Sequence, residues 1–105
     1  MESLLKELVY KYNLEERSME SFWINFNAYA EEEKEEFNEY FPNYQRDNLL
    51  CEISDISFKL RNWPQCDIKV IIINIPMHYN NKHVGYYSIE YDLNGEIFDD
   101  WFVCR

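Results

Sequence analysis

The stretch from Tyr86 to Val103 constrains the fold most, because it contains two alternating strands around an Asn-Gly pair. Asn94-Gly95 favours a two-residue type I′ turn, which needs positive φ at both central positions. Leu93 then faces Glu96, and the register of the other pairs follows from this contact. The predicted pairs are Asp92 with Ile97, Tyr91 with Phe98, Glu90 with Asp99, Ile89 with Asp100, Ser88 with Trp101, Tyr87 with Phe102, and Tyr86 with Val103.

Alternation sorts these residues onto two faces of the hairpin. We predict a core face made of Tyr87, Ile89, Tyr91, Phe98 and Phe102. Asp100 falls on the same side, so we expect it at a sheet edge or as the acceptor of a buried hydrogen bond. The second face is acidic and aromatic, and it carries Tyr86, Ser88, Glu90, Asp92, Asp99 and Trp101, with Ile97 and Val103 among them.

Glu90 and Asp99 are predicted to lie directly opposite each other. A like-charge pair in this position destabilises a sheet by about 0.2–1 kcal/mol, so a purely structural sheet has little reason to keep it. The acidic and aromatic face therefore indicates a surface that meets a positively charged partner. One alternative is that Lys59, Arg61 or Lys69 neutralises the pair within the sheet. Another is a homo-oligomer, in which this face packs against a copy of the same chain.

The first half of the chain shows helical spacing of its apolar residues. Residues 3–12 form one amphipathic helix, which Asn13 ends. A second helix starts near Ser18 as its N-cap. A third is predicted over 28–41, capped by Asn27 and ended by Pro42. The apolar stripes of the first two helices are Leu4, Leu5, Leu8, Val9 and Tyr12, then Met19, Phe22, Trp23 and Phe26.

The apolar period changes from 3.6 to 2 after residue 48. A first strand over 56–61, starting as early as Leu50, is followed by a turn at 62–65. The β-branched run 68–75 predicts an interior strand that Pro76 ends, and 78–83 predicts a polar loop. The chain is thus a single domain, 1–105, of the α+β class. We expect two or three N-terminal helices packed on one face of a four-stranded antiparallel meander sheet.

Composition narrows the range of partners. The chain has 105 residues, with 20 acidic and 10 basic side chains and a formal charge of −10. Such a charge disfavours direct binding to nucleic acid or to an anionic membrane and favours a basic protein, or serves solubility alone. No apolar stretch is long enough for a secretory signal or a membrane span. Three cysteines without CxxC spacing indicate reduced thiols, so we expect a cytoplasmic protein.

A second acidic surface is predicted in the helical half, where the run 31–36 holds five glutamates around Lys34. In a continuous helix, Glu31 with Glu35, Glu32 with Glu36, and Glu35 with Glu39 are like-charge neighbours. The run is either a solvated face, favoured near a helix N-terminus, or a ridge that binds a partner. The residues that carry this second candidate surface are Glu32, Glu35, Glu36 and Glu39.

No motif for catalysis, metal binding or cofactor binding stands out. His78 and His83 have no third ligand at a suitable spacing, and no local pattern supports Cys51 or Cys66 with His78 as a catalytic pair. Asp99 and Asp100 point to opposite faces of a strand, so they do not form an acid–base pair. Gly85 and Gly95 are too few for a phosphate-binding loop. We therefore expect no enzyme, no metal and no cofactor.

Size, acidity, the order of helices then meander, and the acidic aromatic hairpin together resemble the immunity proteins of bacterial polymorphic toxin and contact-dependent growth inhibition systems. The resemblance implies a protein that binds and neutralises a cognate basic toxin domain, often a nuclease, by covering its active site or a nearby surface. The partner-binding residues are expected to be Glu90, Asp92, Asp99, Trp101 and Tyr86, or the glutamates of the helical run. The alternatives are a nucleic-acid mimic that inhibits a DNA- or RNA-processing enzyme, and a small structural or oligomeric interaction domain.

Overall fold

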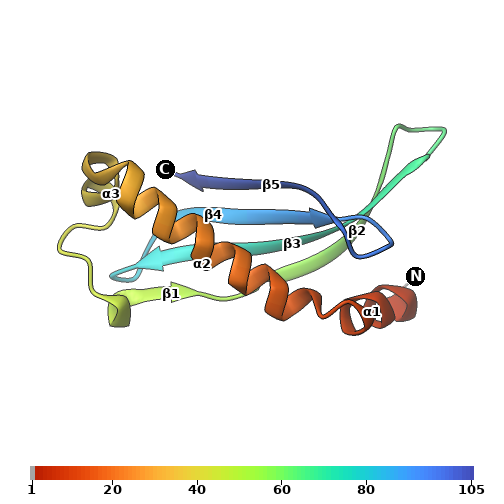
Figure 1. Ribbon diagram of the computed structural model, residues 1–105, viewed down its shortest axis with the longest axis horizontal. Coiled ribbons are helices and arrows are strands. Elements are labelled where there is room, and N and C mark those ends of the chain that lie inside the picture. The colour runs from red at the N-terminus through yellow and green to blue at the C-terminus, as the bar shows by residue number, and fades with distance from the viewer. Residues whose placement is uncertain (1) are drawn as a thin grey trace.

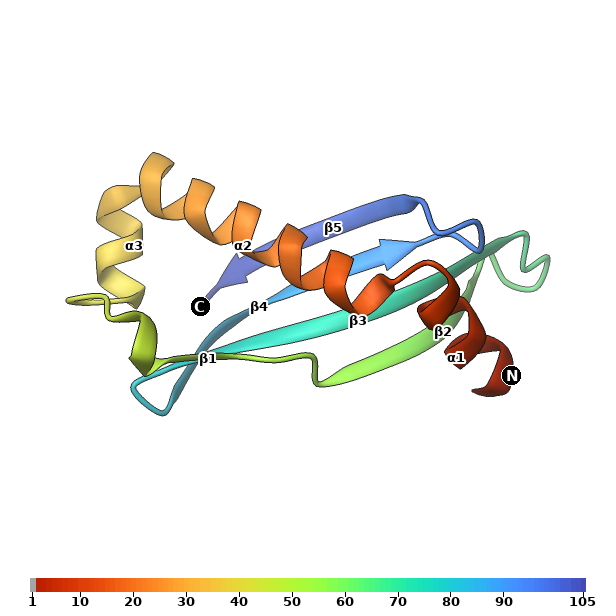
Figure 2. The same ribbon diagram turned by 60° about the horizontal axis from the view of Figure 1, so that its bottom comes forward.

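The computed structural model describes residues 2–105 and has two layers, with helices on one face of an antiparallel sheet (Figures 1 and 2). This confirms the predicted α+β class. The chain folds in the order α1 (Glu2–Lys11), α2 (Leu14–Glu32), α3 (Lys34–Tyr40), a 3₁₀ turn (Arg46–Asn48), β1 (Leu49–Cys51), β2 (Asp55–Arg61), β3 (Ile68–Tyr79), β4 (Lys82–Tyr91) and β5 (Ile97–Cys104).

The sheet has five strands within the described residues, one more than predicted. The strand expected from Leu50 onward is split into β1 and β2, and both pair with β3. The order across the sheet is β1-β3-β4-β5, so β5 is an edge strand. Pro76 does not end β3, because it lies where β1 has stopped and β2 has not begun. A residue without an N–H is tolerated at such an unpaired stretch of a strand.

The two hairpin turns differ from the prediction. The segment 78–83 is not a loop, because His78 and His83 pair across β3 and β4 around a two-residue turn. Asn80 and Asn81 in that turn both have positive φ, 53° and 65°, which is the backbone that a type I′ turn requires. The type I′ turn predicted for Asn94-Gly95 is therefore found one hairpin earlier.

The helix boundaries also correct the sequence analysis. Asn13, at φ 54°, ends α1 as predicted, but α2 starts directly after it. Ser18 is not an N-cap: it is buried inside α2, and its hydroxyl is hydrogen bonded to that of Tyr91 at 3.0 Å. Asn27 lies within α2 as well, and the helix break falls at Glu33.

The core lies between α2 and the sheet. One side of α2 contributes Leu14, Phe22 and Phe26, which are buried against the inward-facing residues of β3 and β4. Alternation along these strands supplies the opposing apolar surface. The inward-facing residues are Ile71, Ile73, Ile75 and Met77 of β3 and Tyr87, Ile89 and Tyr91 of β4. The opposite side of the sheet is covered by no helix, and we call it the outer face (Figure 2).

Candidate partner-binding surface

The predicted hairpin register is correct over most of its length. Five cross-strand pairs from Glu90–Asp99 to Tyr86–Val103 are observed as expected. Near the turn, however, Tyr91 pairs with Ile97 and not with Phe98. The loop has three residues, because the Asp92 N–H donates to the Glu96 carbonyl at 2.8 Å. A bulge at Phe98 then offsets the longer loop and restores the predicted register.

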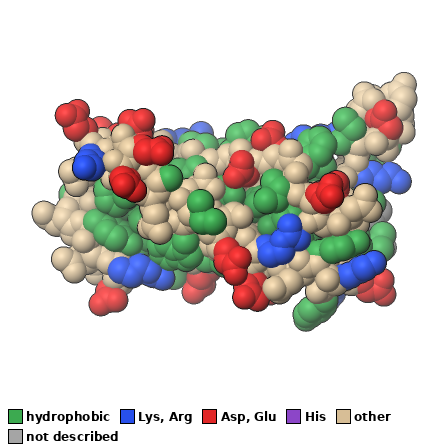
Figure 3. Space-filling view, in the orientation of Figure 1, with side chains coloured by type: hydrophobic (Ala, Val, Ile, Leu, Met, Phe, Trp, Pro, Cys, Tyr) green, Lys and Arg blue, Asp and Glu red, His purple; other side chains and the backbone are tan. Residues whose placement is uncertain are grey.

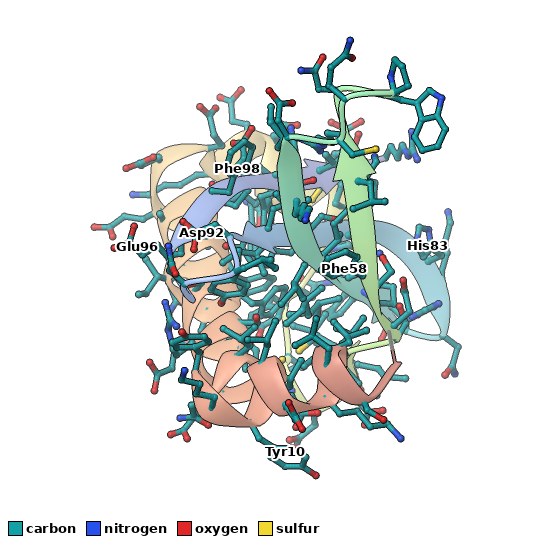
Figure 4. All side chains as sticks on the ribbon, turned by 90° about the vertical axis from the view of Figure 1, so that its right-hand side faces the viewer. Tyr10, Phe58, His83, Asp92, Glu96 and Phe98 are labelled. Atoms are coloured by element: carbon teal, nitrogen blue, oxygen red, sulfur yellow. The ribbon has the colours of Figure 1, made fainter. Side chains whose placement is uncertain are left out.

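The sequence contains a signal for this loop. Asp92 and Gly95 occupy the first and last positions of a type I turn, where aspartate and glycine are preferred. The Gly95 N–H donates to the Asp92 carbonyl at 3.1 Å, and Gly95 has a φ of 80°. The Asp92 carboxylate accepts hydrogen bonds from the N–H groups of Asn94 and Glu96 at 2.8 and 3.0 Å. Figure 4 shows Asp92 and Glu96 together at this loop.

The bulge moves Phe98 out of the core, where we had predicted it. Its side chain is 47% exposed, and the Arg61 guanidinium lies over its ring at 5.8 Å from the centroid. Figure 4 shows Phe98 on the far side of the sheet from α1, whereas Phe58 lies on the α1 side. The aromatic surface on the outer face is therefore larger than the sequence analysis indicated.

Glu90 is not the open surface charge that the sequence analysis assumed. Its side chain is 1% exposed, and Oε2 forms an ion pair with Arg61 of β2. The alternative that a cation of the sheet neutralises Glu90 is therefore correct, and the cation is Arg61. Among residues 2–105, nothing donates a hydrogen bond to the other carboxylate oxygen, Oε1.

The other predicted residues of this face lie in different environments. Asp99 is exposed, and one of its oxygens accepts the Asp100 N–H at 2.8 Å. Trp101 is 39% exposed. Tyr86 is half-buried beneath the guanidinium of Arg105. Asp92 is partly buried, and its hydrogen bonds hold the hairpin loop.

The first half of β5 is exposed on both sides over residues 97–101. In Figure 1, α2 crosses the sheet diagonally and covers only the end of β5 near α3. Phe102, at that end, packs against Phe22 and Tyr29 of α2. Asp100 accepts a hydrogen bond from the Tyr87 hydroxyl at 2.8 Å, as expected for this position at a sheet edge. Ile97, which is 54% exposed, completes a patch that also contains Phe98, Asp99, Asp100 and Trp101.

A shallow hollow of about 380 Å³ lies on the outer face beside this patch. Its floor is polar as well as apolar, since the Ser88 hydroxyl donates to Oδ1 of the Asn74 side chain. The Asn74 amide in turn donates to Asp55 at 2.9 Å. The hollow is lined by Lys59, Arg61, Ile72, Asn74, Tyr86, Ser88, Glu90 and Trp101.

The helical acidic run forms a separate surface at the corner between α2 and α3. Its glutamates are exposed, and acidic side chains gather at the α3 end of the molecule in Figure 3. The break at Glu33 separates Glu31 and Glu32, at the end of α2, from Glu35 and Glu36, in the first turn of α3. The predicted pairs Glu31–Glu35 and Glu32–Glu36 therefore do not share one helix, whereas Glu35 and Glu39 both lie in α3. Over 2–105, none of the carboxylates at 31–36 or of Glu39 forms an ion pair with a lysine or arginine.

The arginines of this chain lie against aromatic side chains. Each arginine of the chain lies over an aromatic ring within 6 Å of its centroid, a cation–π arrangement. Three of them form no ion pair within the described residues. The ring partners are Tyr91 for Arg17, Trp23 for Arg46, Phe98 for Arg61 and Tyr86 for Arg105.

The remaining reactive groups are scattered. His78 and His83 stack edge-to-face at 5.2 Å, but no group of three potential metal ligands occurs in the described part of the chain. Burial raises the pKa of the Cys51 and Cys104 thiols.

No described helix combines the length and apolarity needed to cross a membrane.

Comparisons with protein families, with curated proteins and with solved structures give no match to this chain.

Proposed function

We propose that this protein is an inhibitor that binds a basic partner protein through the exposed half of β5. In this proposal it neutralises a cognate toxin domain, such as a nuclease, in the cytoplasm of a bacterium. The observation that carries the proposal is the patch at residues 97–101, where three large apolar side chains and two aspartates are exposed together on an edge strand.

Such a patch is unusual for a sheet edge that serves only a structural role. Natural proteins shorten, cover or charge their edge strands, because exposed apolar edges promote association. Here the apolar residues Ile97, Phe98 and Trp101 stay exposed beside Asp99 and Asp100. Aromatic side chains anchor protein interfaces, and flanking carboxylates select a basic partner.

The charge of the whole molecule supports the same choice of partner. A net charge of −10 gives a negative field that speeds association with a basic protein. The corner between α2 and α3 is the second candidate contact, through Glu32, Glu35, Glu36 and Glu39. A nuclease is a suitable target, because its substrate cleft is positive in order to bind phosphates.

The two alternatives receive less support. A homo-oligomer in which this face packs against a copy of the same chain would place the Asp99 side chains of both copies in one interface, where like charges repel. A nucleic-acid mimic needs carboxylates along a continuous ridge, whereas the helical run is divided at Glu33.

The test is binding to the protein encoded by the adjacent gene, measured by calorimetry from about 50 mM to about 500 mM NaCl. We expect affinity to fall with salt. Asp99→Lys should weaken binding by at least about tenfold, because it reverses a charge at the interface. Glu52→Lys, an equal charge change at an exposed site between β1 and β2, is the matched control. Salt-independent affinity, or equal effects of the two variants, would contradict the proposal.

A further inference from the structure

One carboxylate oxygen of Glu90, in the hollow of the outer face, has no hydrogen-bond donor within residues 2–105. The Glu90 side chain is 1% exposed, and the oxygen without a donor is Oε1. A buried carboxylate oxygen without a hydrogen-bond donor is costly, and such atoms are rare in folded proteins. Glu90 lines the hollow while Oε1 itself is buried, so a donor from outside the chain reaches this oxygen when the side chains around it move aside.

Three of the polar side chains that line the hollow, those of Arg61, Ser88 and Asn74, are already engaged, and Lys59 lines it as well. The Arg61 guanidinium serves Oε2 and lies over Phe98. Ser88 and Asn74 are hydrogen bonded to each other. Asp99, directly opposite Glu90 on β5, adds a second negative charge. The missing donor is therefore expected to be cationic.

Trp101 supplies the second part of the site. It pairs with Ser88, lies on the same face as Glu90 and lines the same hollow. Its ring is partly exposed, and no lysine or arginine of the described chain lies over it. The neighbouring ring of Tyr86, in contrast, is already covered by Arg105.

We propose that this hollow is a receptor for an arginine side chain of the basic partner. The inference rests on the proposed function and names the contact that would give it specificity. The incoming guanidinium donates to Oε1 of Glu90 and stacks on the indole of Trp101. Glu90 thus bridges two guanidinium groups, one on each oxygen, which is the arrangement of a buried Arg–Glu–Arg triad.

Arginine suits the hollow better than lysine. Its guanidinium is planar, stacks on an aromatic face and is more weakly hydrated than an ammonium group. The site offers an incoming cation one flat ring, that of Trp101, and one carboxylate oxygen, that of Glu90. Lys59 of the same chain lies on the β2 side of the hollow, away from β5. A compact, strongly hydrated ammonium gains less from stacking on the ring.

The pocket is tested without the toxin by titrating capped amino acids, N-acetylated and C-methylamidated, into the ¹⁵N-labelled protein. We expect capped arginine to shift the Trp101 indole N–H and the Glu90 amide. Capped arginine should bind at least about fivefold more tightly than capped citrulline, its uncharged analogue. Equal binding of citrulline, or shifts confined to other surfaces, would overturn the proposal.

Two pairs of variants give the matched controls. Trp101→Ala and Glu90→Gln should each weaken binding of capped arginine at least about fivefold. Trp63→Ala, in the exposed turn between β2 and β3, and Glu96→Gln, in the hairpin loop, should not change it. If Glu90→Gln fails to fold, the comparison of Trp101→Ala with its control Trp63→Ala tests the site. Loss of binding in the control variants to the same extent would refute the site.

The two proposals fail in different ways. If the neighbouring gene's product binds and Asp99→Lys weakens this binding, but Glu90→Gln binds the product as the parent protein does, the arginine site is wrong and the proposed function stands. If capped arginine binds at Trp101 but the neighbouring protein does not bind at all, the proposed function fails and the site remains.

Discussion

Arg61 of β2 and Glu90 of β4 form an ion pair across the intervening strand β3, on the outer face of the sheet. The pair explains how the sheet tolerates Glu90 directly opposite Asp99, because Arg61 supplies a positive charge beside them. The ion pair also means that the hairpin exposes less acidic surface than the sequence predicts. The exposed acidic surface of the hairpin is reduced to the edge strand. Glu90 is a buried group, and its Oε1 accepts no hydrogen bond within residues 2–105.

Removing Arg61 should destabilise the fold. Arg61→Met leaves the Glu90 carboxylate buried without its cation, and we expect a loss of about 2–3 kcal/mol in the free energy of unfolding. This is below the usual range for buried pairs because Arg61 itself is 29% exposed. Urea denaturation gives the value. Lys59→Met, on the same strand and face, should change stability by less than about 0.5 kcal/mol, and an equal loss there would contradict this role of the pair.

Gly85 should not tolerate a side chain. Its φ is 150°, and an added Cβ would lie 2.0 Å from the Val103 carbonyl oxygen of β5. Gly85→Ala should therefore displace β5 and cost at least about 2 kcal/mol, measured by urea denaturation. Asn81→Gly, at φ 65° in the type I′ turn, should be neutral or stabilising. A fully stable Gly85→Ala variant would show that β4 and β5 are not packed this closely.

Asp92 should contribute to the stability of the hairpin and not to the affinity for the partner. Asp92→Ala removes the acceptor of two loop N–H groups, and we expect a loss of about 1–2 kcal/mol in unfolding free energy. Asp92→Asn keeps an acceptor oxygen and should lose less. Partner affinity of the folded Asp92→Ala protein should match that of the parent. A large drop in affinity without a drop in stability would restore Asp92 as a contact residue.

The two halves of the acidic run should respond to charge removal with opposite signs. Glu32 lies at the C-terminal end of α2, where a negative charge is unfavourable, and Glu35 lies in the first turn of α3, where it is favourable. Glu32→Gln should raise the melting temperature and Glu35→Gln should lower it, each by the equivalent of about 0.3–1 kcal/mol. Thermal unfolding monitored by circular dichroism measures both, and shifts of the same sign would contradict this assignment.

Stability should fall in alkaline solution. Burial raises the pKa of Cys51 and Cys104 above the ordinary thiol value of 9.0, so the folded state holds these protons more tightly than the unfolded state. Their contribution is complete below pH 9 and is lost as the pH rises through the folded pKa values. Urea denaturation under reducing conditions at a series of pH values measures this slope. Cys51→Ala should reduce it, because Cys51 belongs to the hydrophobic core.

Local pattern identified most elements because the information lies within a few residues. Period-two alternation placed β4 and β5 and five of their pairs. The spacing of Phe22 and Phe26 placed the buried side of α2. Where two local signals competed, the weaker one was sometimes correct. Asn94-Gly95 suggested a type I′ turn, but Asp92 and Gly95 together specify the three-residue loop that formed.

The sequence by itself determined the α+β class, the edge hairpin and the excess of acidic charge, because each depends on periodicity or composition. Tertiary structure alone decided that Ser18 lies inside a helix against Tyr91, and that Phe98 lies on the outer face over Arg61. It also selected Arg61, from three candidate cations, as the partner of Glu90. These outcomes depend on contacts between residues far apart in the chain, and such contacts form only when the helices and strands pack together.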